Sequence, residues 1–539
     1  MSFIQAILVS ALYYYSAVEF PYCLYSIICR PVMGGMITGL ILGDMVTGLL
    51  VGAAVQLIFL APSGFGGVVP TDRPAAGIIS AAAVITTGIS VEAGVALSVP
   101  AALLFAQLHT VRRIVASVWV HMADRYALTG NTRGIVLAGT LYPTLFKIPL
   151  FWAPMCLMLF YGTGAVGSIV ESLPQWLLAG LDVTGQLLPA LGFAMTIRMI
   201  GRRELMPFFL AGFFLMQYTG MSTMALVLVA LFLAYLYMIF TRDKENEVSA
   251  SGMFKSMSEA VDASKKRILT KRDVTKVWLR WYAAAEMSNS FERLQSLAFC
   301  ISFTSALKKL YGDDPEELSA ALTRHLQFFN TEGNLGAIIH GIALSMEEQR
   351  AMGEPITGEA IVGLKTGLMG PLAGIGDTII WATISTIILV AILPAASQGQ
   401  AWAPIVMTLG FGGLIAFIGW AMTHVGYRLG TKAATTLLSS GVLNKYITFF
   451  AVLGLFMMGG MTSGFVVVQT PLVIMDISVQ YGVLDAIVPG ILTLVTVWST
   501  YEYLRKGKGN TMLKATMALF VIGMIFGALG ILGTPLPIG

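Results

Sequence analysis

The chain has 539 residues, of which 56% are hydrophobic and only 12% are charged, and its formal net charge is +4. Soluble domains carry roughly 25% charged residues, so this composition excludes a soluble globular protein and indicates an all-α membrane protein with many spans. The small net charge gives no support for nucleic-acid binding. The first residues lack the basic start and cleavage site of a signal peptide, so we expect them to remain as the first membrane helix.

Residues 1–240 predict one membrane module made of apolar helices. Within it, the block Arg112–Arg133 is too polar to span a membrane and predicts an amphipathic helix followed by a loop. The expected spans are 3–20, 32–60, 75–108, 134–162, 178–200 and 206–240.

Two polar positions of this module are candidate binding residues, because polar side chains are costly inside a membrane. Gln56 lies in an apolar run, and Asp72 closes the glycine-rich segment Ser63–Thr71. This segment is too irregular for an ordinary helix and predicts a re-entrant loop that carries Asp72 toward a cavity. The alternative is an interfacial turn in which Asp72 caps the next helix. For Asp44 we expect a structural role, as a cap or in an ion pair.

A change in composition separates this module from a second one. The stretch 241–273 is rich in charged residues and serine and predicts a linker, which its lysines and arginines assign to the cytoplasm. The second module, 274–539, is expected to begin with a polar helical part at 274–355. Its membrane part is expected at 356–539.

The polar part is expected to contain two marked helices. Asp314 is a suitable cap and Pro315 a suitable first residue for a helix that continues to Asn330. A second helix is expected over Leu335–Arg350. The spans expected after it are 363–393, 402–425, 445–470, 484–504 and 512–532.

The segment Gly363–Asp377 combines five glycines with a proline in an apolar run. Glycines spaced four apart allow membrane helices to approach closely, and Pro371 with the later glycines predicts a break in the helix. Irregular backbone inside a membrane is tolerated where it is packed in protein or lines a cavity. Asp377 is therefore a candidate solute-binding residue, and a structural role at the helix end is an equal alternative.

The segment Glu286–Gln295 predicts a helix that places Glu286, Ser290 and Arg293 near one face. Its apolar neighbours argue against a fully solvated helix, which is the alternative interpretation. Asn289 offers neutral hydrogen bonds, as Ser290 does.

Two charged residues of the same segment have expected partners of their own. We expect Glu292 and Arg293 to pair with Asp377 or with neighbouring chains.

No nucleophile elbow, Walker loop or metal-ligand spacing occurs in the sequence, so no catalytic residue, cofactor or metal is expected. The four cysteines are expected to be small buried apolar residues. They are Cys23, Cys29, Cys156 and Cys300.

Both halves contain segments that resemble one protein family. The first half, in Cys29–Leu60 and Arg202–Phe213, resembles the IIC component of mannose-family sugar phosphotransferase (PTS) permeases. The second half resembles the IID component of the same permeases. The segments that carry this second resemblance are Phe291–Cys300, Arg324–Glu332, Glu347–Gly353 and Gly367–Asp377.

The resemblance implies two inverted-topology modules with broken or re-entrant helices, joined here in one polypeptide of the bacterial cytoplasmic membrane. It implies a homotrimer in the lipid bilayer that holds a sugar between the modules and moves it by an elevator-like motion. Soluble IIA and IIB partners would phosphorylate the sugar, with the phosphoryl-carrying histidine on IIB. No catalytic residue is therefore expected on this chain.

The candidate site departs from the family pattern at several positions. The family pattern is close to Gln-x-Ser-Trp-Asn-Phe-Glu-Arg, whereas this chain has Glu286, Asn289 and Ser290 at three of these positions. Gln56 stands where relatives tend to carry glutamate. We therefore expect an amino sugar or a glycated amine, whose amino group would pair with Glu286, rather than plain mannose or glucose.

An ion-coupled secondary sugar transporter is the alternative function, and a receptor without transport is a third class. The coupling group of a secondary transporter would be Asp72, Glu286 or Asp377. The complete set of expected substrate-binding residues is Gln56, Asp72, Glu286, Asn289, Ser290, Glu292, Arg293 and Asp377.

Overall fold

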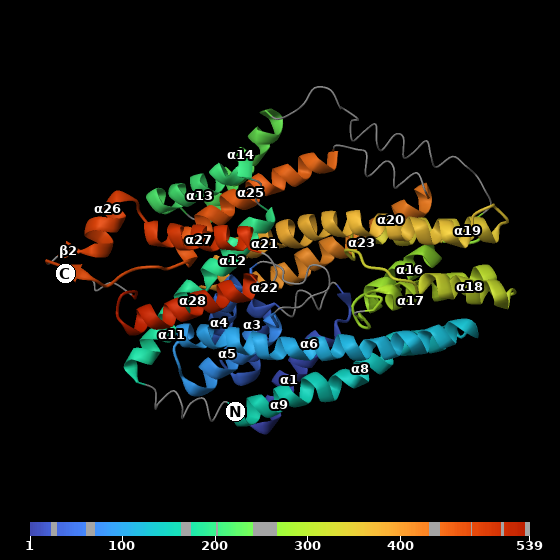
Figure 1. The fold of residues 1–539 in the computed structure, drawn as a ribbon, viewed down its shortest axis with the longest axis horizontal. Coiled ribbons are helices and arrows are strands. Elements are labelled where there is room, and N and C mark those ends of the chain that lie inside the picture. The colour runs from blue at the N-terminus through green and yellow to red at the C-terminus, as the bar shows by residue number, and fades with distance from the viewer. Residues whose placement is uncertain are drawn as a thin grey trace.

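The computed structural model is built almost entirely of helices (Figure 1). It describes residues 1–22, 30–60, 71–162, 174–200, 203–221, 223–240, 267–290, 292–430, 442–475, 477–507 and 511–533. In these ranges the only paired strands are β1 (Val473–Ile474) and β2 (Ile477–Ser478), which form a short antiparallel hairpin. The predicted all-α fold of a polytopic membrane protein is confirmed.

Four helical stretches of the described residues are long and apolar enough to cross a membrane. A fifth candidate is a pair of helices bent by 66°. The four stretches are Val91–Leu128, Thr132–Gly162, Gly358–Ala396 and Trp402–Arg428, and the bent pair is Val479–Ile487 with Ile491–Lys506.

The first half contains more breaks than its apolar runs predict. Its helices are α1 (Phe3–Val18), α3 (Pro31–Leu42), α4 (Met45–Ile58), α5 (Arg73–Thr87), α6 (Val91–Leu128), α7 (Thr132–Gly139), α8 (Leu141–Lys147), η2 (Ile148–Trp152), α9 (Ala153–Leu157), η3 (Met158–Gly162), α11 (Gln175–Leu187), α12 (Pro189–Ile200), η4 (Arg203–Leu205), α13 (Met206–Thr219) and α14 (Thr223–Phe240).

The predicted span 32–60 is wrong, because α3 and α4 form a tight helical hairpin. Gly43 ends α3 in a left-handed conformation (φ 95°), and Asp44 Oδ1 accepts the Thr47 N–H at 3.0 Å, which caps α4 as expected. The two helices touch through glycines. A Cβ atom on Gly35 would lie 2.4 Å from the carbonyl oxygen of Gly48.

The predicted division between the span 75–108 and a polar block 112–133 is also wrong. The chain turns earlier, at Gly88, which ends α5, and Ser90 caps α6. From there α6 runs without interruption to Leu128. Arg112 and Arg113 do not start a new amphipathic helix, because both are buried within α6.

The second half joins a cluster of polar helices to long apolar ones. Its elements are α16 (Lys271–Ala284), α17 (Ser296–Tyr311), α18 (Pro315–His325), α19 (Ala337–Ala351), α20 (Gly358–Gly376), η5 (Asp377–Ile384), α21 (Ser385–Ala396), α22 (Trp402–Val406), η6 (Met407–Phe411), α23 (Gly412–Leu429), α25 (Val442–Phe465), η7 (Val479–Leu484), α26 (Asp485–Ile487), α27 (Ile491–Lys506) and α28 (Thr511–Ala528).

The polar helices begin where the sequence predicts. Asp314 Oδ1 accepts the Glu317 N–H at 3.0 Å, so the predicted cap of α18 is confirmed, although the helix ends at His325 rather than at Asn330. Of the predicted linker, residues 241–266 lie outside the described residues. Its last three residues already belong to α16, which Thr270 caps.

The predicted helix break inside Gly363–Asp377 is wrong. The backbone stays helical through α20 and passes directly into the π-helical stretch η5 and then into α21. A π-helical stretch adds a residue to the turn without ending the helix. The irregularity that the sequence signals is therefore a wider turn that starts at Asp377.

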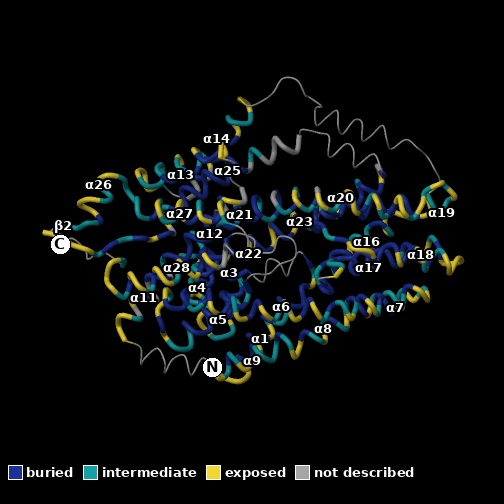
Figure 2. The backbone as a smooth tube through the Cα atoms, in the orientation of Figure 1, coloured by how far each residue is buried: buried dark blue, intermediate teal, exposed yellow. Residues whose placement is uncertain are grey.

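Helices of the two halves pack against one another throughout the molecule (Figure 1), with α13 along α25, α11 along α28 and α12 along α27. A Cβ atom on Gly459 of α25 would lie 1.9 Å from the carbonyl oxygen of Phe209 in α13, so this contact requires glycine. Arg30 of the first half also donates a hydrogen bond to Ser385 of the second. Two of the clusters of buried hydrophobic side chains contain residues of both halves, so the halves share buried cores (Figure 2).

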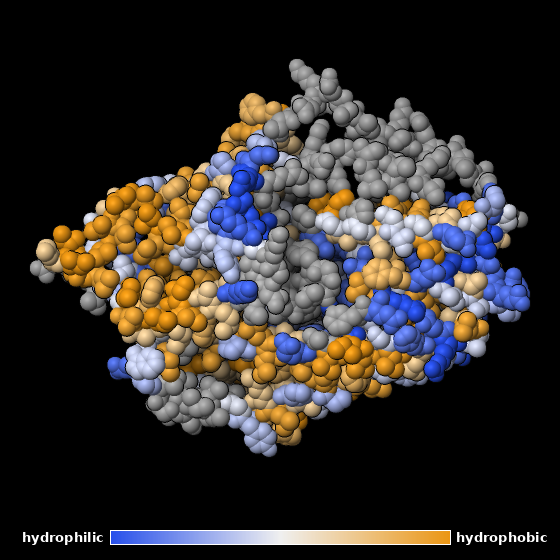
Figure 3. All heavy atoms as spheres, in the orientation of Figure 1, coloured by the Kyte–Doolittle hydropathy of each residue, from blue (hydrophilic) through white to orange (hydrophobic). Residues whose placement is uncertain are grey.

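The two ends of the molecule differ in polarity. Figure 3 shows a largely hydrophobic surface over the end that carries α26 and β2, and a hydrophilic surface over the end that carries α17, α18 and α19.

Candidate functional site

The segment Glu286–Gln295 is a loop, so the predicted helix is wrong. α16 ends at Ala284, and Leu294 adopts a left-handed conformation (φ 48°) that a helix does not allow. Leu294 forms isolated β-bridges with Ser290 and with Phe329, which satisfy backbone groups that a helix would have paired internally. Glu286, Ser290 and Arg293 therefore do not share a helix face.

The first part of this loop turns its polar groups inward. The Glu286 carboxylate accepts hydrogen bonds from Asn289 Nδ2 and from Gln295 Nε2, both at 2.7 Å. Ser290 Oγ accepts the Arg293 N–H at 3.3 Å. Asn289 Oδ1 is buried and has no hydrogen-bond partner among the described residues. The loop thus presents the Glu286 carboxylate and one further hydrogen-bond acceptor, Asn289 Oδ1, to a candidate ligand.

The second part of the loop is tied to α6. Arg293 forms a bidentate ion pair with Asp124, at 2.7 Å and 2.9 Å, and Glu292 lies 3.1 Å from His121 Nε2. The expected pairing of Glu292 and Arg293 with Asp377 is wrong. These two residues instead join the loop to the C-terminal part of α6.

A second acidic residue, Glu332, packs its side chain against Gly376, the residue before Asp377. Glu332 is buried and accepts the Leu335 N–H at 2.7 Å, the Trp381 indole N–H at 3.2 Å and a hydrogen bond from Asn334. Glu332 and Glu286 both act electrostatically on Asp377. Sequence reasoning missed Glu332, which directly follows Asn330 and Thr331 and gives no local signal; only its buried partners in the fold mark it.

Aromatic side chains from both halves surround these carboxylates. Tyr22 of the first half lies edge-on to Tyr282, with ring centroids 5.8 Å apart, and edge-on to Trp381 at 5.9 Å. Trp281 donates to the Gly333 carbonyl at 2.9 Å. Trp281 and Tyr282 are buried, so they are not part of an aromatic belt at the membrane surface.

A buried lysine connects the loop to the first half, and sequence reasoning missed it. Lys147 Nζ donates to the Val18 carbonyl at 3.2 Å and to the Met287 carbonyl at 3.0 Å. It also lies 3.8 Å from Glu19, which pairs with Arg112. A lysine inside an apolar helix was the available signal, because such residues are costly unless they have partners.

Asp72 and Gln56 occupy different settings in the first half. Asp72 accepts the Ala75 N–H at 3.0 Å and the Tyr13 hydroxyl at 2.5 Å, and it lies 3.1 Å from His109, so the capping alternative is realised. Gln56 is buried, and its Oε1 has no partner among the described residues. The predicted re-entrant loop falls almost wholly on residues 61–70, which lie outside the described residues.

The polar helices are held by a buried charge cluster. Arg324 binds Glu347 through two hydrogen bonds of 2.7 Å and 2.8 Å, and His325 Nε2 lies 2.8 Å from the same carboxylate. Burial alone would raise the pKa of Glu347, but the hydrogen bonds from Arg324 and His325 hold that pKa below its usual range. Burial lowers the pKa of His325 to about 4, so the imidazole is neutral at pH 7.

Two other expectations concern cysteines and metals. Cys156 and Cys300 are buried free thiols, as predicted, whereas Cys23 and Cys29 lie outside the described residues. Over the described part of the chain, no group of three or more histidine, cysteine or acidic residues has the geometry to hold a metal ion.

Comparison with known families assigns each half separately. Residues 268–532 match the family described as "PTS system mannose/fructose/sorbose family IID component". Residues 3–236 match the family described as "PTS system sorbose-specific iic component".

Individual relatives follow the same division. The mannose-specific EIID component of Escherichia coli K12 is 34% identical over 286 residues, which cover 51% of this chain and 100% of that protein. The sorbose-specific EIID component of Lacticaseibacillus casei is 34% identical over 272 residues, which cover 49% of this chain and 95% of that protein. The mannose-specific EIIC component of E. coli K12 is 30% identical over 224 residues, which cover 41% and 83%.

Solved structures also match. One described as "Structure of membrane protein" is 34% identical, with a TM-score of 0.45, and covers 49% of this chain and 99% of that chain. Another, of the mannose transporter ManYZ in complex with microcin E492, is 34% identical, with a TM-score of 0.30, and covers 50% and 100%.

Proposed function

Because the chain belongs to the mannose/fructose/sorbose family of sugar phosphotransferase permeases, with a IIC half and a IID half in one polypeptide, we propose that it binds a sugar between these halves and presents it to IIB for phosphorylation during uptake. Membership of this family implies soluble IIA and IIB partners and a location in the inner membrane. The observation that carries the proposal is the Lys147 hydrogen bond to Met287, because it joins the loop bearing Glu286, Asn289 and Ser290 to the IIC half.

The substrate we propose is a sugar that carries an amino group. Glu286 and Glu332 both act electrostatically on Asp377, and the hydrogen bonds to Glu286 and Glu332 come from neutral groups. A cluster of carboxylates next to aromatic rings favours a cationic ligand, through charge pairing and cation–π contact. Lys147 and Arg113 act electrostatically on Glu286, whereas Glu332 and Asp377 form no ion pair among the described residues. A neutral hexose would leave these two carboxylates without a positively charged partner, which disfavours its binding.

The proposed contacts divide by chemistry. Glu286 and Asp377 pair with the amino group. Asn289 Oδ1 and Gln56 Oε1, two buried acceptors without partners among the described residues, accept sugar hydroxyls, and Ser290 adds a neutral contact.

The other three expected site residues are proposed to act by positioning. Glu292 and Arg293 hold the loop against α6, and Asp72 fixes the start of α5 through its cap. Each of them has a partner on a neighbouring helix that explains its placement.

A homotrimer is part of the proposal, and an exposed face of α20 supports close helix packing there. A Cβ atom on any of four glycines of α20 would meet nothing within 4 Å, so a helix from another subunit has room to approach. These glycines are Gly363, Gly367, Gly370 and Gly374.

Ligand-induced stabilisation tests the substrate class. The purified full-length chain in lipid nanodiscs is heated with a panel that pairs each amino sugar or glycated amine with its neutral parent sugar. Binding at 100 times Kd stabilises a protein by about 2.7 kcal/mol, enough for a clear shift of the midpoint. We expect shifts with the amine-bearing members only. Equal shifts with neutral hexoses would refute the proposed substrate class.

A further inference from the structure

Two helices of this protein are much longer than a membrane requires. α6 has 38 residues and the stretch Gly358–Ala396 has 39, which at 1.5 Å per residue is nearly 60 Å each. The hydrocarbon core is only about 30 Å thick. Each helix must therefore project into water at one or both ends.

Their polar ends project on the same side. The last turns of α6 carry Asp124 and Arg125, and the first turn of α20 carries Glu359. Leu128 at the end of α6 and Gly358 at the start of α20 line one cleft together with α18, so both ends lie at the end of the molecule that carries α18 (Figure 1), where the surface is hydrophilic (Figure 3).

This end is also where the linker enters the IID half. Asp273, in the first turn of α16, pairs at 2.7 Å with Lys309 near the end of α17, only a few residues before α18 starts. The residues leading into α16 include several lysines and arginines, which mark the cytoplasmic side. The hydrophilic end therefore faces the compartment in which soluble phosphoryl carriers move.

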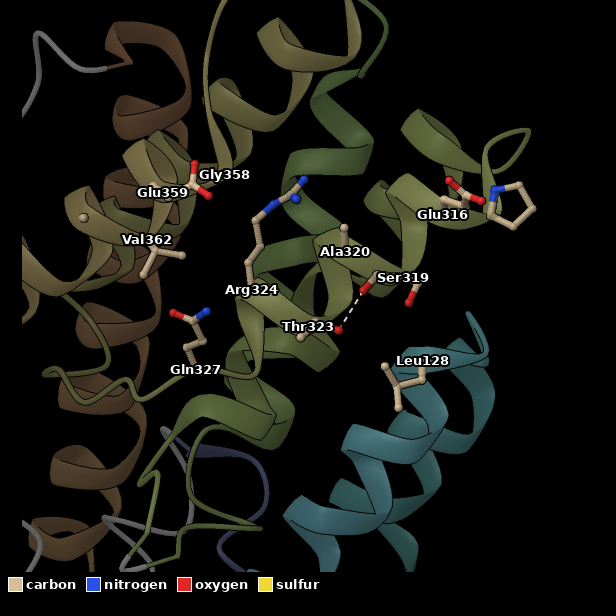
Figure 4. Close-up of a pocket in the computed structure, with 12 residues that line it drawn as sticks. Leu128, Glu316, Ser319, Ala320, Thr323, Arg324, Gln327, Gly358, Glu359 and Val362 are labelled. Carbon is tan, nitrogen blue, oxygen red and sulfur yellow. Dashed lines mark hydrogen bonds between the residues drawn. The ribbon is translucent and has the colours of Figure 1, made fainter.

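The cleft between the projecting helices has a volume of about 920 Å³ (Figure 4). α18 forms one wall with Glu316, Thr323 and Arg324, α20 forms the other with Glu359, and Leu128 of α6 closes one side. The close-up shows these side chains coming from three separate helices around one open space.

A second cleft, of about 550 Å³, continues the first one inward. The two share Leu128, Thr323 and Gln327, and the inner cleft reaches Glu292 and Arg293. Those two residues belong to the same loop as the proposed sugar contacts. One groove thus leads from the cytoplasmic end of the protein to the edge of the proposed sugar site.

The outer rim of the groove is acidic. Glu316 and Glu359 are exposed, whereas Arg324 on the wall is already neutralised by Glu317 and Glu347. A domain that holds a phosphohistidine needs basic residues near the phosphoryl group, because each phosphoryl group carries nearly two negative charges. Such a basic surface complements the acidic rim.

We propose that the groove between α18, α20 and the end of α6 is the docking surface for the phosphohistidine-bearing IIB partner. This rests on the proposed function and adds the place at which the partner binds. Glu316 and Glu359 attract the basic surface around the partner's histidine, and the walls formed by α18 and α20 seat it beside the loop that holds the sugar.

Binding of a purified mannose-family IIB domain to the full-length chain in nanodiscs tests the proposal. We expect the double variant Glu316→Lys/Glu359→Lys to weaken binding at least tenfold, with an effect that shrinks as salt is added. Ala320→Trp, on the exposed α18 wall, should weaken binding without any change in charge. Glu92→Lys, an exposed reversal at the opposite end of α6, is the matched control and should change the affinity less than twofold.

Sugar-induced stabilisation of the same variants distinguishes a wrong docking surface from a wrong proposed function. We expect the groove variants to keep the native shift with sugar, because they lie outside the proposed sugar contacts. Native IIB affinity in both groove variants, with sugar binding intact, would overturn the docking surface and leave the proposed function standing. If the native chain binds neither sugar nor IIB, the proposed function fails and the docking proposal falls with it.

Discussion

Replacing Lys147 by methionine tests how firmly the two halves are joined at the loop. Methionine keeps most of the side-chain volume but removes the hydrogen bonds to the buried Val18 and Met287 carbonyls. A buried polar group left without a partner costs about 1–3 kcal/mol, so the two carbonyls together cost about 2–6 kcal/mol. Glu19 keeps its pairing with Arg112, which limits the further loss.

We expect Lys147→Met to lower the free energy of unfolding by about 2–6 kcal/mol. It should also weaken sugar binding, because the loop then loses its hydrogen bond to the IIC half. Thermal unfolding of the nanodisc-embedded protein, with and without sugar, measures both effects. Lys308→Met, at an exposed position of α17, is the control and should stay within about 0.5 kcal/mol of the native protein. A native unfolding profile and native sugar affinity for Lys147→Met would refute the assigned role.

Three further predictions concern the site, the polar cluster and the shared core. Glu286→Gln should weaken binding of amine-bearing sugars at least tenfold without weakening the binding of their neutral parents, and isothermal titration of each pair measures the ratio; an unchanged ranking would sink the charge-pairing role. For His325, burial puts the folded pKa near 4, below the usual value of about 6.5, so the unfolded chain takes up the proton first and stability should fall as pH drops from about 6.5 to 4. His325→Gln should flatten this part of the stability profile, and an equally steep profile would argue against the neutral buried imidazole. Gly459→Ala should destabilise the protein, because its Cβ would meet the Phe209 carbonyl, whereas Gly413→Ala at an open, exposed position of α23 should not; equal unfolding midpoints would contradict the close packing of α13 on α25.

The sequence was most informative where one local rule decides the structure. Asp314 and Asp44 are side-chain caps, as their positions predict, because a cap needs only the next three residues. The membrane class could also be predicted from the sequence, because composition indicates it. The two family resemblances could be recognised because long sequence motifs carry them.

The failures share a physical cause, which is that distant partners override local preference. Pro371 and the glycines near it predict a break, yet the helix continues into η5. The segment Glu286–Gln295 reads as a helix, but the backbone of Leu294 pairs with that of Phe329, 35 residues later in the sequence. Neither outcome can be deduced from a window of neighbouring residues.

The candidate site was predicted only in part for the same reason. Glu286 and Asp377 were identified because charged residues in apolar surroundings stand out. Glu332 and Lys147 were missed, because their importance depends on partners brought close by folding, such as Trp381 and Met287.

Uptake into vesicles tests the central claim most directly. Inside-facing IIA and IIB, a phosphoenolpyruvate-driven phosphoryl relay and a labelled amine-bearing sugar are combined with vesicles that contain the full chain. We predict that label accumulates only when the relay is complete, and that it is recovered inside as sugar phosphate. Accumulation of unmodified sugar, driven by a proton or sodium gradient without the relay, would contradict a phosphotransferase permease and favour an ion-coupled transporter.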